Sequence, residues 1–331
     1  MYSLIENFPT QLRQALSQVS NVSILPPEYE IRNICIFGMG GSAIGAKFVK
    51  DILKPYCPLP IEIVSGYEVP EYINVHTLVL ASSYSGNTEE ILSCIRSILS
   101  KNAKVVCITS GGSLLKLAEE NGLEYVKLPG GSKSPRAFLG VSMVCQLAVL
   151  VDLQLAPSSC FEQIRVGADL LSFEQDDIKQ KANSIAQALQ GKTPMIYTSE
   201  RMESVAIRWR QQMNENGKIL CGHHVIPEMN HNEIVGWEFL QNNTIIILIR
   251  NRDDFRRNAQ RFDIIKSQLQ KKTSSLIEIF SKGQSTIEKM LYLAHLGDWV
   301  SYFLAIQNDV DPVEIKMIDY LKDELSKNEV L

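Results

Sequence analysis

Short apolar runs alternate along this chain with segments whose apolar spacing suits helices. In the first half, five runs have the length of a buried strand: 33–37, 61–64, 78–81, 104–109 and 124–128. Helical patterns lie between them, for example from Glu89 to Ile95. Strands and helices that alternate form a parallel sheet covered by helices on both faces. We therefore predict an α/β fold built on a doubly wound parallel sheet.

The second half of the chain repeats this alternation. Strands are expected at 195–198, 218–220, 244–249 and 275–279, and helices at 177–190, 200–213, 284–306 and 312–328. Residues 154–175 between the halves are polar and mixed in composition, and 331 residues are many for one hydrophobic core. We predict two domains with the same element order, 20–153 and 154–331.

Composition argues against several classes of protein. The net charge of −4 disfavours nucleic acid or an anionic membrane surface as the main partner. The 7 cysteines are scattered without a CxxC pair, which fits thiols in a reducing cytosol. The N-terminal residues lack the pattern of a signal peptide, and no uncharged apolar run approaches the roughly 20 residues of a membrane span. We expect a cytoplasmic protein.

A hydroxyl-rich loop lies between the predicted strand at 78–81 and the helix that starts near Glu89. Its hydroxyl side chains are Ser82, Ser83, Ser85 and Thr88. Because a helix N-terminus offers unpaired N–H groups and hydroxyls add donors, this arrangement suits a dianion held by neutral groups. A helix cap alone would need only one hydroxyl. We therefore favour phosphate binding over simple capping.

A glycine-rich turn, Gly38-Met39-Gly40-Gly41-Ser42, follows the first strand. Its glycines allow a tight turn and a close approach of the backbone to a ligand. The spacing is not G-x-G-x-x-G, and no clear ribose-binding acid follows about 20 residues later, so a nicotinamide site is not favoured. The turn and the hydroxyl loop both follow strand carboxyl ends, so we expect them to share one crevice.

Arg136 lies after a glycine-rich segment and is flanked by Pro135, Ala137 and Phe138. A surface charge is the alternative interpretation, but these neighbours are unusual for a solvated charge. The planar guanidinium presents a fork of N–H donors that suits an oxyanion. We favour a functional role for this arginine.

Two further candidates lie in the second half. Glu215 ends a predicted helix among amides, where it is either a general base or a solvated carboxylate. His231 lies in a polar, irregular loop, which favours function over a core position. A metal cluster of His223, His224, Glu228, His231 and Glu233 is a weaker hypothesis. H-E-x-x-H is absent, and adjacent histidines on a strand point to opposite faces.

Three of these motifs resemble the sugar isomerase (SIS) domain: Gly-Met-Gly-Gly-Ser at 38–42, Ser-Ser-Tyr-Ser-Gly-Asn-Thr-Glu-Glu at 82–90 and Ser-Pro-Arg-Ala-Phe-Leu-Gly at 134–140. With Asn-Glu-Asn at 214–216 and Asn-His-Asn-Glu at 230–233, the chain resembles the bifunctional phosphoglucose/phosphomannose isomerases of archaea and bacteria. The resemblance runs from about residue 20 to the end. The hydroxyl loop alone marks only the broader SIS superfamily.

The resemblance implies two SIS domains in tandem, an active homodimer, and no metal or cofactor. The implied reaction interconverts fructose 6-phosphate with glucose 6-phosphate and mannose 6-phosphate through a cis-enediol(ate). Arg136 would stabilise the enediolate, Glu215 would move the proton between C1 and C2, and His231 would open the sugar ring from the other subunit. Lys322 of the last helix would assist, with Lys316 as its rival. The phosphate would be bound by Gly41, Ser42, Ser83, Ser85 and Thr88.

Two other functions fit part of the pattern. A non-catalytic SIS-type sugar-phosphate sensor would keep Ser83, Ser85 and Thr88 but would need neither Glu215 nor His231, and no helix-turn-helix extension is visible. Amino-sugar chemistry by a glutamine amidotransferase would use an N-terminal cysteine, whereas residue 2 is Tyr. The isomerase is the preferred prediction. The preference for glucose or mannose depends on the room around C2, which spacing does not reveal.

Overall fold

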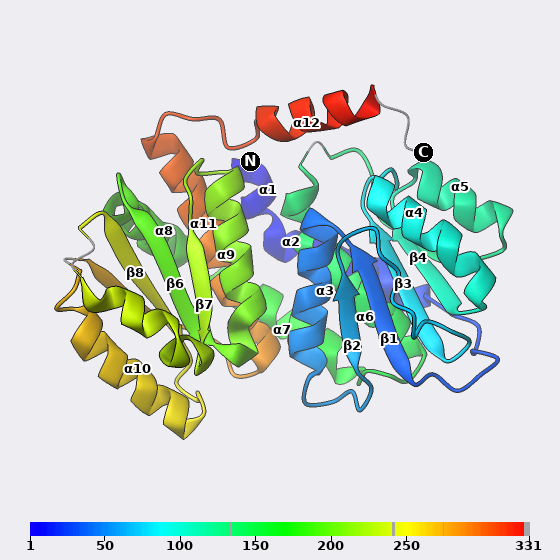
Figure 1. Ribbon diagram of the computed structural model, residues 1–331, viewed down its shortest axis with the longest axis horizontal. Helices are drawn as coiled ribbons and strands as arrows, with labels where there is room; N and C mark the ends of the chain where they lie inside the picture. The colour runs from blue at the N-terminus through cyan, green and yellow to red at the C-terminus, as the bar shows by residue number, and fades with distance from the viewer. Residues whose placement is uncertain (133, 240–241, 274, 328–331) are drawn as a thin grey trace.

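Two parallel β-sheets lie side by side in the computed structural model, which describes residues 1–132, 134–239, 242–273 and 275–327 (Figure 1). The first sheet has the order β2-β1-β3-β4-β5, and its strands are β1 (Asn33–Gly38), β2 (Ile61–Val64), β3 (Thr77–Ser83), β4 (Lys104–Thr109) and β5 (Glu124–Lys127). The second has the order β7-β6-β8-β9, with β6 (Thr193–Ser199), β7 (Gly222–Ile226), β8 (Thr244–Arg250) and β9 (Leu276–Phe280). All described strand pairs are parallel. The predicted α/β fold is confirmed.

Helices cover both faces of the first sheet. Its central strands β1, β3 and β4 are buried on both sides, as their continuous apolar runs require, whereas the edge strands β2 and β5 are partly exposed. Ile34 and Ile36 of β1 face α3 and α6, whereas Cys35 and Phe37 face α4 and α5. The bounds of these helices are α3 (Gly40–Leu53), α4 (Glu89–Ile98), α5 (Gly112–Glu120) and α6 (Leu139–Asp152).

The second sheet is covered in the same way. Tyr197 and Leu248 pack on α10 (Arg256–Leu269), whereas Ile196 and Ile247 share a core with α9 (Glu203–Glu215) and α11 (Thr286–Gln307). This core is continuous with the inner face of the first sheet, so the two halves are packed together. The remaining helices are α1 (Tyr2–Glu6), α2 (Phe8–Gln18), α7 (Ser159–Phe173), α8 (Gln175–Leu189) and α12 (Lys316–Ser326).

Three predicted elements differ from the structure. Residues 218–220 are not a strand, because Lys218 has a φ of 56° in the left-handed region; β7 begins at Gly222 instead. Residues 154–175 include α7, whose buried stripe was hidden by its polar outer face. The last helix begins at Lys316 rather than 312, and its predicted end at residue 328 lies outside the described residues.

The segment Pro135–Asp152 is the one described helix whose length and apolar composition would allow it to cross a membrane. In the fold, 78% of this window is buried. Its helix α6 packs between α2 and α3 on the inner face of the first sheet. Burial in the core therefore accounts for its apolar composition.

We propose the domain division predicted from the sequence, 20–153 and 154–331. Helix α6 is the last element that covers the first sheet, and it ends at Asp152. Helix α7 follows and packs against α11 of the second half. Helix α2 contacts both α6 and α7, so the N-terminal helices join the two units.

The buried ion pair between α9 and α11 supports a stability prediction. Arg208 donates to both carboxylate oxygens of Asp298 at 2.9 and 2.8 Å, and the two side chains are 1% and 6% exposed. We expect Asp298→Ala to lower the free energy of unfolding by about 3–5 kcal/mol, because it leaves the guanidinium buried without its counter-charge. Urea titration followed by circular dichroism measures this loss.

The matched control replaces both partners with apolar groups, Arg208→Met with Asp298→Leu. This double variant should lose much less stability than the single one, since no unpaired charge is left behind. An equal loss in both variants would contradict the explanation by an uncompensated charge.

Candidate active site

Two loops meet at the carboxyl end of the first sheet, between β1 and β3. This is the point where the strand order reverses, and open α/β sheets bind ligands there. The backbone N–H of Tyr84 in the hydroxyl loop donates to Ser42 Oγ in the glycine-rich turn at 3.3 Å. The two loops therefore lie together at this end of the sheet, as predicted.

The hydroxyl loop leaves the N-terminus of α4 open. Thr88 is at the N-cap position, but its hydroxyl lies 2.7 Å from Ser83 Oγ and forms no capping bond with a described residue. The N–H of Gly86 also donates to Ser83 Oγ, at 3.1 Å. Among the described residues, no side chain caps the first N–H groups of α4, which is what an anion site at a helix N-terminus requires. Simple capping does not explain these hydroxyls.

Gly86 fixes the conformation of the hydroxyl loop. Its φ is 69°, and a Cβ built on it would lie 1.8 Å from the carbonyl oxygen of Gly111 and 2.8 Å from Thr109 Oγ1. Its own carbonyl accepts the N–H of Leu114 at 2.8 Å. Only glycine fits this contact between the hydroxyl loop and the loop after β4.

Arg136 lies at the junction of the two halves. It belongs to the 3₁₀ helix η3 (Pro135–Phe138) and is 5% exposed, so it is not a surface charge. Its Nε donates to Asn216 Oδ1 at 2.9 Å, and its Nη2 donates to the carbonyls of Pro312 and Val313 at 2.6 and 3.2 Å. Burial lowers the pKa of the guanidinium, and the charge of Glu215 opposes this shift.

Glu215 is the last residue of α9, and one of its carboxylate oxygens lies 3.5 Å from Arg136 Nη1. Its side chain is 29% exposed. Helix α9 starts after the carboxyl end of β6, so it carries Glu215 back to the amino end of the second sheet. That end lies beside the carboxyl end of the first sheet (Figure 1). The structure thus brings Arg136, Glu215 and the two loops to one junction.

A buried network behind Arg136 was not predicted from the sequence. Asn216 Nδ2 donates to Ser301 Oγ at 2.9 Å, and Ser301 Oγ donates to the carbonyl of Asp298 at 2.7 Å. The side chain of Asp298 in turn pairs with Arg208. The only sequence signal was the presence of Asp298 and Ser301 inside an otherwise apolar helical stretch.

His231 is at the other end of the second sheet. It closes the 3₁₀ helix η5 (Glu228–His231), which follows the carboxyl end of β7, and it is exposed. Glu215 is at the amino end, and the 13 residues of α9 span about 20 Å at 1.5 Å per residue. The structure therefore does not bring His231 and Glu215 of the same chain together.

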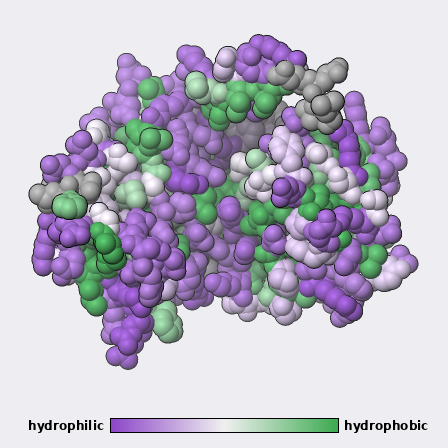
Figure 2. Space-filling model, in the orientation of Figure 1, coloured by the Kyte–Doolittle hydropathy of each residue, from purple (hydrophilic) through white to green (hydrophobic). Residues whose placement is uncertain are grey.

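Lys316 and Lys322 lie on α12, which lies above the space between the two halves (Figure 1). Lys316 Nζ pairs with Glu314 at 2.7 Å, whereas Lys322 forms no ion pair with a described residue. Every described residue of α12 is at least partly exposed. Figure 2 shows a recess between the halves below α12, and apolar side chains gather along this helix. The exposed apolar residues of α12 are Met317, Ile318, Tyr320, Leu321 and Leu325.

The two acids of the weaker metal hypothesis have other partners. Glu233 accepts the hydroxyl of Tyr197 at 2.5 Å, Glu228 accepts Asn232 Nδ2 at 2.8 Å, and burial lowers the pKa of His223 to about 4. Across the described residues, no group of three or more His, Cys, Asp or Glu side chains is placed to hold a metal ion.

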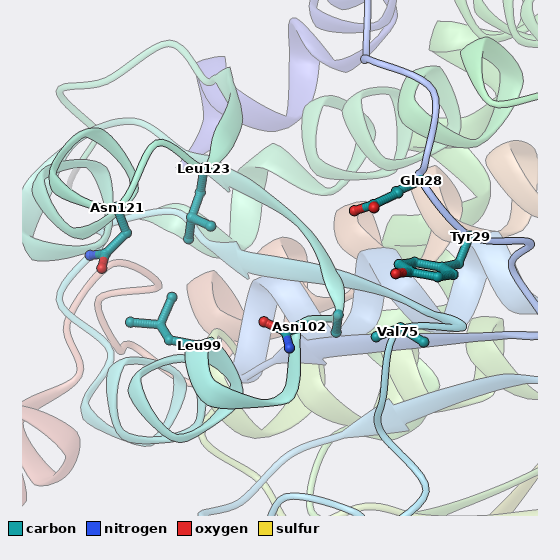
Figure 3. Close-up of a pocket in the computed structure, with 8 residues that line it drawn as sticks. Glu28, Tyr29, Val75, Leu99, Asn102, Asn121 and Leu123 are labelled. Carbon is teal, nitrogen blue, oxygen red and sulfur yellow. The ribbon is translucent and has the colours of Figure 1, made fainter.

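A cavity of about 470 Å³ lies at the opposite end of the first sheet (Figure 3). Val75, Asn102 and Leu123, which precede β3, β4 and β5, belong to its wall. Glu28 and Tyr29 face it from the segment before β1. The cavity is therefore separate from the junction that holds Arg136 and Glu215.

The fold and the two loops define an SIS protein. A sequence model of the SIS domain matches residues 29–124, and one described as the bacterial phospho-glucose isomerase C-terminal SIS domain matches 178–325. In structure, the chain is similar to the C-terminal domain of glucosamine-fructose-6-phosphate aminotransferase from Francisella tularensis. The TM-score is 0.75 and the identity 14%, over 94% of this chain and 96% of that chain.

Relatives with higher sequence identity show which family of SIS proteins this chain belongs to. The chain is 35% identical to the bifunctional phosphoglucose/phosphomannose isomerase of Caldicellulosiruptor bescii, over 99% of each chain. It is also 35% identical to that of Aquifex aeolicus, over 90% of this chain and 91% of the relative. The chain belongs to the family of bifunctional phosphoglucose/phosphomannose isomerases.

The tight contact at Gly86 yields a test of the anion site. We expect Gly86→Ala to weaken the binding of inorganic phosphate at least about tenfold, equivalent to ~1.4 kcal/mol. The added methyl group must displace either the hydroxyl loop or Gly111. Isothermal titration calorimetry measures the affinity.

Gly122→Ala is the matched control, because Gly122 also has a positive φ, of 65°, but nothing lies within 4 Å of a Cβ built there. Both variants carry backbone strain of about 1–3 kcal/mol, so a stability loss alone does not separate them. Equal phosphate affinity in the two variants would disprove the role of the hydroxyl loop.

Proposed function

We propose that this protein is an aldose–ketose isomerase that interconverts fructose 6-phosphate with glucose 6-phosphate and mannose 6-phosphate. The observation that carries the proposal is the placement of Glu215 beside the buried Arg136, which contacts the glycine-rich turn next to the hydroxyl loop. Family membership supports the same reaction. No step of the proposed mechanism uses a metal or a cofactor.

In this proposal, Gly41, Ser42, Ser83, Ser85 and Thr88 bind the phosphate. They supply neutral donors at the N-termini of α3 and α4, whose dipoles favour a dianion. A Cβ built on Gly41 would lie 3.4 Å from Arg136 Cα, so the glycine-rich turn and the arginine are in close contact. Because the phosphate is remote from C1 and C2, its binding serves to position the reacting carbons over Glu215.

Glu215 is the proposed base. It removes the weakly acidic proton from C1 or C2, forms a planar cis-enediol(ate), and returns the proton to the neighbouring carbon. A positioned general base contributes about 10²–10⁴-fold to such a step. Protonation of planar C2 on its two faces yields the glucose and mannose configurations, so one intermediate serves both products.

Arg136 is the proposed partner of the oxyanion that develops on the enediolate. Its donors are fixed by Asn216 and by the carbonyls of Pro312 and Val313, so the guanidinium does not have to reorient during the reaction. A non-catalytic sensor would need phosphate donors but neither a fixed buried cation nor a carboxylate beside it. The pair of Arg136 and Glu215 therefore favours the enzyme.

We further propose a homodimer in which His231 opens the sugar ring in the partner's site, assisted by Lys322 or Lys316. The exposed position of His231, at the end of the sheet opposite to Glu215, supports this arrangement. The exposed apolar side chains of α12 offer surface for a second subunit. We also propose a cytoplasmic location, supported by seven cysteines that are all free thiols.

The first prediction for this function is the product mixture. EDTA-treated protein incubated with fructose 6-phosphate should produce both glucose 6-phosphate and mannose 6-phosphate, which chromatography separates. Glucose 6-phosphate alone would narrow the substrate range and keep the mechanism. Tight sugar-phosphate binding without turnover would instead support the sensor.

Removing the base should abolish turnover but not binding. We expect Glu215→Gln to lower kcat by about 10²–10⁴-fold and to leave phosphate affinity unchanged. Glu203→Gln, at the exposed start of the same helix, is the control and should keep normal turnover. Full activity of Glu215→Gln would rule out its assignment as the base.

Mixing two inactive variants tests the shared site. Glu215→Gln and His231→Ala subunits, unfolded and refolded together, should recover about a quarter of the wild-type activity. Half of the dimers are then mixed, and one of the two sites in each mixed dimer is intact. No recovery, although mixed dimers form, would contradict donation of His231 across the interface.

A further inference from the structure

Lys218 is a charged group at this junction that has no part in the mechanism above. It follows the end of α9 with its backbone in the left-handed region, at a φ of 56°. Its Nζ donates to the carbonyl of Glu215 and, at 2.6 Å, to the carbonyl of Glu314. One ammonium thus joins the residue of the proposed base to a segment almost 100 residues later in the chain.

That later segment, residues 308–315, is the connector between α11 and α12. It is held to the rest of the chain by contacts from the junction. Arg136 Nη2 donates to the carbonyls of Pro312 and Val313, and Asn308 Nδ2 donates to the carbonyl of Gly217 at 3.1 Å. These contacts and those of Lys218 involve Arg136, which pairs with Glu215, and the backbone of residues 215–217, so the same groups hold the connector and the end of α9.

The position of helix α12 depends on the hydrogen bonds that hold the connector. Every described residue of α12 is at least partly exposed, so packing against its own chain does not fix it. The connector runs from the end of α11 to the start of this helix, above the space between the two halves (Figure 1). Both candidate lysines for ring opening, Lys316 and Lys322, lie on this helix.

Acidic groups partly offset the cost of placing a cation at this position. Burial and the neighbouring Arg136 lower the pKa of the Lys218 ammonium, and the negative charges of Asp311, Glu215 and Glu314 oppose this shift. An ammonium at the end of α9 also interacts favourably with the carbonyls of the last turn. A neutral side chain at this position would lose both carbonyl contacts together.

We propose that Lys218 is a positioning residue, whose ammonium ties the end of α9 to the connector and so places Glu215 and α12 relative to each other. The kinetic part of this inference rests on the proposed isomerase function. The structural part, the attachment of the connector, does not. A residue that only capped α9 would affect stability without releasing the connector.

The test uses Lys218→Met, which removes the ammonium and keeps an apolar stem, in the full-length protein. Hydrogen–deuterium exchange should become at least about tenfold faster in residues 311–326 and stay unchanged in β1 and β3, because only the local opening equilibrium shifts. With fructose 6-phosphate, kcat should fall by up to about 10²-fold with little change in KM, as expected for a misplaced group. Lys218→Arg keeps N–H donors at this position, so it should restore most of the slow exchange in residues 311–326 and most of kcat.

Lys327→Met is the control, because Lys327 follows α12 and pairs with Glu324 away from the junction. It should change neither readout. Normal exchange of residues 311–326 in Lys218→Met would overturn the proposal, as would faster exchange spread over the whole chain. If the wild type does not convert fructose 6-phosphate, the proposed function fails while the exchange data still decide the attachment of the connector.

Discussion

The buried guanidinium of Arg136 is the interaction on which the candidate site depends. Burying a cation is costly unless its donors are satisfied. Its acceptors come from the end of α9 and from the connector before α12, far away in the sequence. The two halves must therefore pack in one particular arrangement to satisfy this arginine, and the same arrangement brings Glu215 beside it. The same packing of the two halves thus both satisfies the arginine and assembles the candidate site.

The site separates two electrostatic tasks. In the proposed site, neutral donors bind the anion, namely the hydroxyls and the N-termini of α3 and α4. The positive charge of Arg136 is instead surrounded by an amide and by carbonyl oxygens, and its one described ion pair, with Glu215, is as long as 3.5 Å. Dipoles orient the guanidinium without cancelling its charge, so that charge is available to an oxyanion.

Local patterns predicted the sheets well. Strands buried on both faces appear as continuous apolar runs, and the glycine and hydroxyl loops directly follow them in the chain. The wrong secondary-structure predictions lie where the local sequence pattern does not match the local structure. Lys218 adopts a left-handed backbone that glycine would normally signal, and α7 hides its buried stripe in a polar segment. Sequence spacing also could not reveal that Asn216 bonds to Ser301, 85 residues later.

The sequence by itself determined the α/β class and the position of the two loops after their strands, and it indicated the residue types that we propose for anion binding and proton transfer. These follow from periodicity and from neighbours in the chain, which sequence records directly. The tertiary structure alone decided that Arg136 is buried, that Glu215 lies beside it, and that His231 lies at the far end of the same sheet. Those facts depend on how two separately patterned halves pack, and long-range packing has no signature in any single stretch of residues.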